Sequence, residues 1–226
     1  MAGAGKKTFT AGETLTASDV NTYLMEQSVM VFGGTAARSS AIPTPSQGMT
    51  SYRTDSQQIE SYDGAEWRGM SGLQLVKKQT ILTTVSSVVV TSAFSATYEN
   101  YKIIVSGGVA STTSTISLQL GSATTNYQGV LNYANYAGTT ATPAGSSGSN
   151  FQFAGSADTN AIPFTAELIN PFLAKQTYIE STYIATLNAG KFIGRHNANT
   201  SFTDFTLTPS SGTLTGGTIY VYGYGT

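Results

Sequence analysis

The chain has 226 residues and a formal net charge of −1, and only 10% of its residues are charged, whereas typical soluble domains carry about 25%. Without a basic excess the chain lacks the electrostatic footprint of a nucleic-acid-binding protein. Without cysteine it can form neither disulfides nor thiolate metal sites. No apolar run approaches the roughly 20 residues of a membrane helix, and the N-terminus lacks the apolar region of a secretory signal, so we expect neither membrane insertion nor a signal peptide.

Residues 1–15 are small and polar, and we expect them to form an N-terminal arm. A helix is predicted to follow, because Thr16 can act as its N-cap and Asp19, three residues later, completes a variant of the capping box. Gly33-Gly34 would end this helix. Its stripe at helical spacing consists of Val20, Leu24, Gln27 and Val31. A helix of this length is marginal alone, so it packs either within its own chain or in a short bundle with copies of itself.

The segment 35–47 contains Pro43 and Pro45, and X-Pro pairs favour extended geometry, so it is predicted to be a semi-rigid link. The strands Met49–Arg53 and Gln58–Tyr62 are predicted to form a hairpin, and Asp63-Gly64 is a second turn signal. One small apolar face of this hairpin is predicted to contain Tyr52, Ile59, Tyr62 and Trp67. A two-stranded hairpin is barely stable in water, so these aromatics need a second surface, and residues 16–71 together form a helix-plus-hairpin region for docking and oligomerisation.

Residues 72–226 are predicted to form one antiparallel β-sandwich or jelly roll, because short strands alternate with turn-rich segments. The fold class is therefore mainly β, preceded by one short helix and a small hairpin. The stretch 137–150 is small and uncharged and is predicted to be a long loop. The expected strands are Gln79–Val90, Asn100–Ser106, Thr115–Leu120, Tyr127–Tyr136, Phe151–Ala154, Phe164–Ile169, Tyr178–Leu187, Lys191–Arg195, Phe202–Thr208 and Thr218–Tyr224.

The last predicted strand has one aliphatic face and one aromatic face. Its aromatic face consists of Tyr220, Tyr222 and Tyr224. Such a face is a candidate for burial against another subunit. The alternative is that both faces of the strand are buried within a single sandwich.

Catalytic chemistry finds little support in the sequence. The single histidine, His196, has no G-x-S-x-G nucleophile elbow to accompany it, and we expect it to be a solvated loop residue. Glycoside hydrolysis needs two placed carboxylates, and those of the β-domain are scattered in sequence, although a pair could meet in space. They are Glu99, Asp158, Glu167, Glu180 and Asp204. We therefore expect no enzymatic activity, no metal and no cofactor.

Binding is the remaining class. The segment NYQGVLNYANY interleaves tyrosines, which stack on sugar faces, with amides, which bond hydroxyls. Its candidate glycan-contact residues are Tyr127, Asn132, Tyr133, Asn135 and Tyr136. The same composition also serves ordinary strand packing and protein interfaces.

The first third of the chain resembles the N-terminal region of tailed-bacteriophage virion proteins, the minor tail and fibre-like proteins. The resembling residues are Phe9–Leu24, Gln27–Phe32, Ala37-Arg38, Ile42-Pro43, Pro45, Gly48-Met49, Tyr52, Ile59, Tyr62–Gly64 and Trp67. The C-terminal Ile219–Tyr224 is similar to the last strand of such chains.

The resemblance implies an N-terminal part that docks the protein, a projecting C-terminal β-domain, and commonly a homotrimer. We expect such a trimer to form through Thr16–Val31. It implies a virion protein made in the host cytoplasm, whose partners are its own copies, other virion proteins and a glycan or protein of the host surface. A tail-associated fibre or tail-tip protein for host attachment is the first hypothesis. The alternatives are an architectural head, neck or tail decoration protein, and a glycan-binding module.

Overall fold

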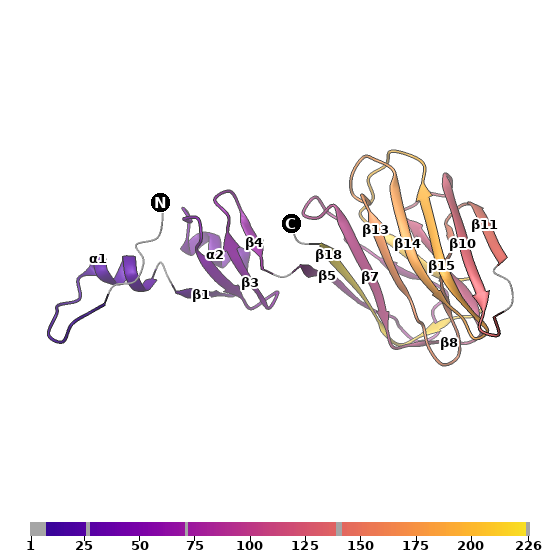
Figure 1. Cartoon of the computed structure of the whole chain (residues 1–226), viewed down its shortest axis with the longest axis horizontal. Helices are drawn as coiled ribbons and strands as arrows, with labels where there is room; N and C mark the ends of the chain where they lie inside the picture. Colours follow the sequence, from indigo (N-terminus) through magenta and orange to yellow (C-terminus); the bar gives the residue numbers. More distant parts are fainter. Residues whose placement is uncertain (1–7, 26–27, 71, 139–141, 225–226) are drawn as a thin grey trace. The chain divides into compact units, whose positions relative to one another are not determined.

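The computed structural model describes residues 8–25, 28–70, 72–138 and 142–224. The fold is mainly β, as the sequence predicted (Figure 1). Contacts between Cα atoms divide the chain into two compact units, with the boundary between Gln74 and Leu75. The smaller unit carries the two α-helices among the described residues, and the larger unit consists of strands and their connections.

The predicted capping box is confirmed at the start of α1 (Ala17–Asp19). The backbone N–H of Asp19 donates to the Thr16 hydroxyl at 3.1 Å, and the Thr16 N–H donates to the Asp19 carboxylate at 3.2 Å. These bonds satisfy donors that a helix start leaves free. The helix continues only as a π-helical turn, η1 (Val20–Met25).

The predicted helix is wrong beyond η1, because residues Val29–Phe32 form the strand β1. β1 pairs in parallel with β2 (Thr50–Arg53), with Val31 opposite Tyr52. Two of its four residues are β-branched valines, which fit a strand well, and the pairing partner lies 21 residues further along the chain. Local spacing favoured a helix, whereas the long-range ladder determines the observed strand.

The predicted link over 35–47 is wrong in its first half, where Thr35–Ala41 form the helix α2. Proline restricts the residue directly before it, and Ile42, before Pro43, leaves the helical region with φ −125° and ψ 77°. The prolines therefore end a helix and do not prevent one.

The predicted hairpin is confirmed as β2 and β3 (Gln58–Tyr62), and a third strand, β4 (Trp67–Gly69), pairs with β3. The sheet order is β1-β2-β3-β4. The turn at Asp63-Gly64 is also confirmed: the Asp63 carboxylate accepts the N–H groups of Ala65 and Glu66 at 2.8 Å each, and Gly64 has φ +106°.

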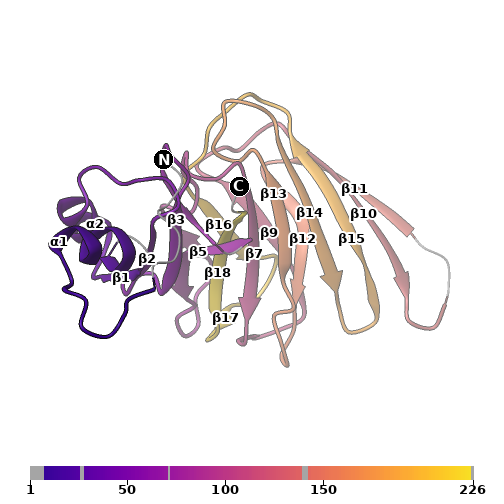
Figure 2. The same ribbon diagram turned by 60° about the vertical axis from the view of Figure 1, so that its left-hand side comes forward.

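The larger unit is a β-sandwich. One sheet has eight strands in the order β11-β10-β15-β14-β13-β7-β18-β5, and the other has four in the order β12-β9-β16-β6. The eight-stranded sheet runs as a broad layer from β5 and β18 at one edge to β11 at the other (Figures 1 and 2). Two short strands, β8 and β17, form a separate pair.

The strands of the large sheet are β5 (Leu73–Thr80), β7 (Asn100–Ser106), β10 (Tyr127–Asn135), β11 (Thr142–Gly148), β13 (Thr165–Ile169), β14 (Thr177–Ile184), β15 (Asn188–His196) and β18 (Thr218–Tyr224). The others are β6 (Val88–Val90), β8 (Val109–Ala110), β9 (Ser114–Leu120), β12 (Phe151–Ala157), β16 (Phe205–Pro209) and β17 (Leu214–Thr215).

The core lies between the two sheets and follows the period of two that strands impose. Ile116, Leu118 and Leu120 on β9 are fully buried, so this face of the strand belongs to the core. Phe205 opens β16 and is buried, whereas Phe202 lies before the strand. The expected strand Phe202–Thr208 therefore begins too early, because the strand starts only at Phe205.

Two predictions fail at the edges of the large sheet. The expected strand Gln79–Val90 is interrupted: β5 ends at Thr80 and β6 begins at Val88, with Thr84 at φ +56° between them. The expected loop over 137–150 contains β11, which pairs with β10 from Tyr127 opposite Gly148 onward. An edge strand is held by backbone hydrogen bonds on one side and does not require alternating apolar residues. β11 therefore lacked the alternation by which a strand is recognised in a sequence.

Candidate docking and receptor-contact surfaces

The small unit is held together by buried charge. Arg38 on α2 and Glu60 on β3, each 5% exposed, form an ion pair. Arg53 Nη1 binds the second carboxylate oxygen of Glu60 at 3.0 Å, and its Nη2 binds Asp55 at 2.9 Å. The Arg38 guanidinium also lies 4.6 Å from the centroid of the Trp67 ring, within cation–π range. This network joins the helix to one face of the four-stranded sheet.

The same network shifts the acidity of its members. Its hydrogen bond to Asp55 raises the pKa of Arg53 above the ordinary value, and the bond from Arg53 lowers the pKa of Asp55. In the next turn, the N–H groups of Glu66 and Ala65, followed by the Arg68 side chain, lower the pKa of Asp63 to about 2. Both carboxylates are therefore strongly held in their charged form.

The prediction that Tyr52, Ile59, Tyr62 and Trp67 share one face is wrong. Tyr52 and Ile59 lie on one face of the sheet, and Tyr62 and Trp67 lie on the other. Tyr62 and Trp67 lie opposite each other with ring centroids 5.6 Å apart. They share the parity of Glu60 and so face α2. A cavity of about 380 Å³ beside them is lined by Arg38, Ser39, Ile42, Pro43, Pro45, Tyr62, Ala65, Glu66 and Trp67.

The opposite face of this sheet is open, and its central row is apolar, whereas the neighbouring row Val29–Thr50–Ser61–Arg68 is mostly polar. Val31, Tyr52 and Ile59 are direct neighbours across β1, β2 and β3, and Met70 continues the row through its N–H bond to the Ile59 carbonyl at 3.0 Å. Exposure is 65% for Val31, 46% for Ile59 and 69% for Met70; Val29 on β1, on the same face as Val31, is 56% exposed. We call these residues the open face: Val29, Val31, Tyr52, Ile59 and Met70.

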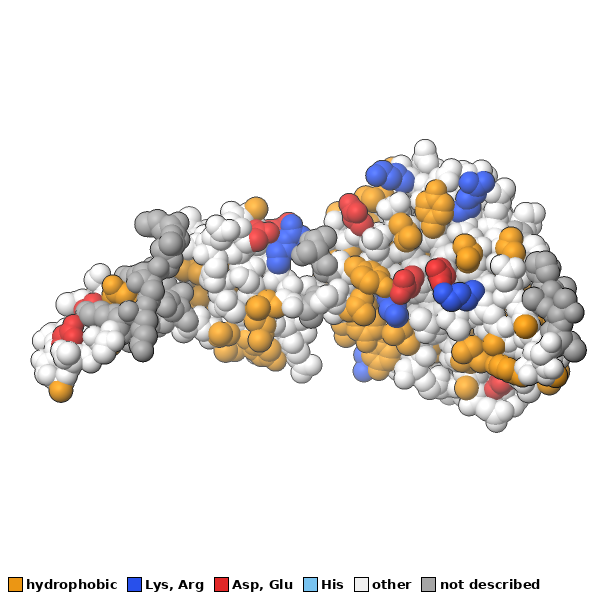
Figure 3. Space-filling model, viewed as in Figure 1, with side chains coloured by type: hydrophobic (Ala, Val, Ile, Leu, Met, Phe, Trp, Pro, Cys, Tyr) orange, Lys and Arg blue, Asp and Glu red, His pale blue; other side chains and the backbone are white. Residues whose placement is uncertain are grey.

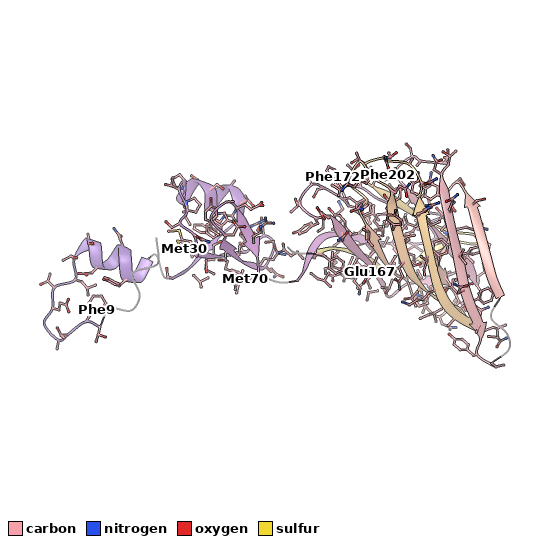
Figure 4. The ribbon with its side chains drawn as sticks, turned by 45° about the horizontal axis from the view of Figure 1, so that its top comes forward. Phe9, Met30, Met70, Glu167, Phe172 and Phe202 are labelled. Atoms are coloured by element: carbon pink, nitrogen blue, oxygen red, sulfur yellow. The ribbon has the colours of Figure 1, made fainter. Side chains whose placement is uncertain are left out.

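Met70 and Met30 are labelled in Figure 4. Met30 alternates with Val31 along β1, so its side chain lies on the other face of the sheet.

The other residues of the predicted helical stripe are not part of the open face. Val20 is half-buried in η1. Gln27 lies outside the described residues, and so does the side chain of Leu24.

The C-terminal strand β18 has the two faces that the sequence predicted. Ile219 and Val221 are fully buried in the core. Tyr220, Tyr222 and Tyr224 are half-buried on the outer face of the large sheet, and the rings of the first two stack at 6.3 Å. Burial, followed by the neighbouring Glu167, raises the pKa of Tyr224 to about 12.

The middle of this outer face carries paired charges. Glu167 and Glu180 are direct cross-strand neighbours; Lys102 binds the former at 3.4 Å, and Lys191 forms an ion pair with the latter. Red and blue side chains lie together there, with orange side chains around them (Figure 3). Two of the five scattered carboxylates thus do meet in space, each with an ammonium partner.

The predicted glycan-contact set is divided between two faces. Tyr127 is 1% exposed, and its hydroxyl accepts the Leu120 N–H at 2.8 Å, so it cannot touch a receptor; burial raises its pKa to about 12. Tyr133 is half-buried against Tyr183, at 6.3 Å between ring centroids. Asn132, on the outer face of β10, Asn135 and Tyr136 are exposed.

The expectation for His196 is also wrong. It is the last residue of β15 and is 2% exposed. Its ring packs edge-on against Tyr127 at 4.8 Å and Phe202 at 5.1 Å. Neither ring nitrogen has a hydrogen-bond partner among the described residues. His196 therefore belongs to an aromatic cluster of the core; Phe202 and, close to it, Phe172 are labelled in Figure 4.

A groove of about 450 Å³ lies at one end of the β10–β11 pair. It is lined by Thr124, Thr125, Asn126, Tyr127, Gln128, Ser147, Gly148, Ser149 and Asn197. Gln128 and Asn197 were not among the site residues predicted from the sequence. The alternation of β10 could have found Gln128, because it shares the outward parity of Asn132.

A scan of protein-family models and searches of curated proteins and of solved structures gave no match. Within the described part of the chain, no helix is long and apolar enough to cross a membrane. The described residues contain no group of three or more histidine, aspartate or glutamate side chains that could hold a metal ion.

Proposed function

We propose that the chain is a non-enzymatic structural component of a tailed-bacteriophage virion, a tail-associated fibre or tail-tip protein that contributes to host attachment. The assignment to a virion rests on the resemblance of Phe9–Trp67 to the N-terminal region of such proteins. The observation that carries the docking role is the open face of the small sheet, where neighbouring apolar side chains remain exposed.

The open face supports docking because contiguous exposed apolar surface marks interaction sites. The central row Val31–Tyr52–Ile59 contains no charged side chain, which fits an apolar partner surface on another virion protein or on a second copy. Three residues that the sequence singled out for an interface share this face, although they were predicted in different elements.

In this proposal the protein is made in the host cytoplasm, assembles as a homotrimer and enters the particle through its small unit. The β-sandwich then presents its outer face to the host surface. The architectural alternative, a head, neck or tail decoration protein, uses the same docking face but leaves the sandwich in contact with other virion proteins.

Complementation of a phage that lacks this gene tests the proposal. The double variant Val31→Ser/Ile59→Ser removes two exposed apolar side chains worth about 1.5–3 kcal/mol each when buried, so incorporation into particles should fall at least about tenfold. Ile193→Ser is the matched control, because Ile193 is 55% exposed on the sandwich.

Incorporation is measured by immunoblot of purified particles. Normal incorporation of the double variant would contradict docking through the open face. Absence of the wild-type protein from particles would remove the virion proposal itself.

Light scattering of the purified chain gives the oligomeric state, and a monomer, both free and in the particle, would exclude the trimer. Immunogold labelling separates a tail position from the head or neck.

A further inference from the structure

We propose that the edge of the large sheet around Gln128 and Asn197 binds a neutral polysaccharide of the host cell surface. This inference rests on the proposed attachment function and names its ligand class. Four side chains form a row across the outer face: Tyr178 on β14 is opposite Arg195 on β15, which is opposite Gln128 on β10, which is opposite Ser147 on β11. Neighbouring strands lie about 4.8 Å apart, so the row spans roughly 14 Å, long enough for more than one sugar ring.

The groove at the end of the row has the chemistry of a site for hydroxyl groups. Its nine lining residues include amides and hydroxyls and no charged side chain. The cation beside the groove, Arg195, binds the Gln128 carbonyl oxygen through its Nε–H and is not part of the lining. An apolar peptide would find no large aliphatic surface in this lining. A neutral polyhydroxylated chain can exchange hydrogen bonds with the amides and hydroxyls.

The side-chain amides of Gln128 and Asn197 are each fixed through the carbonyl oxygen, which leaves the amide nitrogen available to a ligand. The carbonyl oxygen of Gln128 accepts the Arg195 Nε–H at 2.9 Å, and that of Asn197 accepts the Gln176 Nε2–H at 2.8 Å. The Asn126 amide nitrogen donates to Thr125 at 3.2 Å. Among the described residues, no partner is seen for the amide nitrogens of Gln128 and Asn197. Both nitrogens can therefore donate hydrogen bonds to sugar oxygens.

An exposed aromatic ring completes the row. Tyr178 is 43% exposed, and its hydroxyl donates to the Gln176 carbonyl oxygen at 3.2 Å. Since Gln176 in turn donates to Asn197, the ring and the groove are connected by one chain of hydrogen bonds. An amphipathic ring fixed at its polar end offers its apolar face to a ligand at low entropic cost.

The floor of the groove is rigid. Tyr127 lines it from below, with its phenol bonded to Leu120 and its ring packed on His196 and on Phe151, both at 4.8 Å. The N–H of Asn197 donates to the Asn126 carbonyl at 2.8 Å, which joins the two loops that carry these amides. A site on such a support loses little conformational freedom on binding.

Titration of the purified full chain with the neutral fraction of the host cell-wall polysaccharide tests the inference. The variants Gln128→Ala and Asn197→Ala should each weaken binding about 3- to 10-fold, the effect of one lost uncharged hydrogen bond, and the double variant more than about 10-fold. Asn160→Ala is the matched control: this exposed amide lies in the connection between β12 and β13, outside the lining of the groove, and the variant should bind as wild type does.

Labelled wild-type protein is also added to intact host cells. Periodate, which cleaves vicinal diols, should abolish this binding, and protease should not. Wild-type binding of the polysaccharide by the double variant would overturn the site. Binding to cells that survives periodate but not protease would replace the glycan by a protein receptor and leave the attachment function standing. Failure of the wild type to bind cells at all would remove the attachment function together with this inference.

Discussion

His196 ends β15 and lies in the core of the sandwich. It is buried between Tyr127 and Phe202, and its ring nitrogens find no partner among the described residues. A buried polar group without a hydrogen bond costs about 1–3 kcal/mol of stability. The ring therefore stabilises the fold through its contacts with the aromatic cluster, while its nitrogens oppose folding.

Two substitutions separate these contributions. His196→Ala removes the ring and leaves a cavity, and should lower the free energy of unfolding by about 2–4 kcal/mol. His196→Phe keeps an aromatic ring and removes both nitrogens, so its stability should lie within about 1 kcal/mol of the wild type or above it. Urea denaturation followed by far-UV circular dichroism measures both. An equal loss in the two variants would show that the nitrogens are satisfied.

Asp63 gives the small unit a pH dependence of known sign. Its pKa is lowered from 3.8 to about 2 by the N–H groups of Glu66 and Ala65 and by Arg68. A carboxyl whose pKa is lower in the folded state stabilises it fully above the unfolded pKa, and this contribution disappears as the pH falls through the folded value. It is therefore complete above about pH 4 and gone below about pH 2.

The variant Asp63→Asn tests this. It should unfold more easily than wild type at pH 6, and the difference should shrink from about pH 4 downward, because a protonated Asp63 and an asparagine are both neutral. Trp67 is the single tryptophan and lies in the same unit, so its fluorescence follows the transition. A difference that persists at pH 2 would contradict the assignment.

At the scale of elements, two glycines explain how β10 and β15 accommodate a large core ring. Gly129 and Gly194 are cross-strand partners, and the Phe192 ring lies over both: a Cβ on Gly129 would meet the ring at 2.3 Å, and one on Gly194 at 3.0 Å. The small residues are required by packing, because neither has a positive φ.

We expect Gly129→Ala to cost about 1–3 kcal/mol by overpacking. Gly145→Ala is the control: Gly145 lies on the adjacent strand β11, and a Cβ there would have nothing within 4 Å. It should be neutral or stabilise by up to about 1 kcal/mol, because alanine restricts the unfolded chain. Chemical denaturation measures both, and similar values for the two would contradict the role of the Phe192 ring.

The strands that the sequence predicted have a local apolar–polar alternation, whereas the strands that it missed are defined only by the strands with which they pair. β7 and β18 alternate apolar and polar residues, and their predicted bounds agree with the structure. β1 and β11 do not reveal themselves in this way. β1 carries an apolar run that also fits a helix, and β11 is built of small residues, so only their partners β2 and β10 define them as strands.

At the scale of the whole molecule, the two units rely on different interactions. The sandwich buries a large apolar core, whereas the buried centre of the small sheet is the Arg38–Glu60 pair with Arg53. Removing one partner of a buried ion pair costs about 3–5 kcal/mol, because the other charge remains buried. The buried hydrophobic residues of the described chain all lie in the larger unit, so the small unit is expected to be the less stable part.

Glu60→Ala should for this reason move the Trp67 fluorescence transition to much lower urea concentration. The far-UV circular dichroism transition, dominated by the sandwich, should stay within about 0.5 kcal/mol of the wild type. Arg68→Ala is a matched control in the same sheet, since the Arg68 ion pairs are solvent-exposed and worth about 0–1 kcal/mol. A common shift of both signals would show that the two units unfold as one.

The sequence alone determined the mainly β class, the capping box at Thr16, the hairpin Thr50–Tyr62 and the two-faced last strand, because each of these depends on spacing within a short segment. The tertiary structure alone decided which residues meet. It separated Tyr52 and Ile59 from Tyr62 and Trp67, buried Tyr127 and His196, and brought Gln128 and Asn197 to one groove. The physical reason is that strand pairing and core packing join residues far apart in the chain, and a face or a site exists only after those pairings are made.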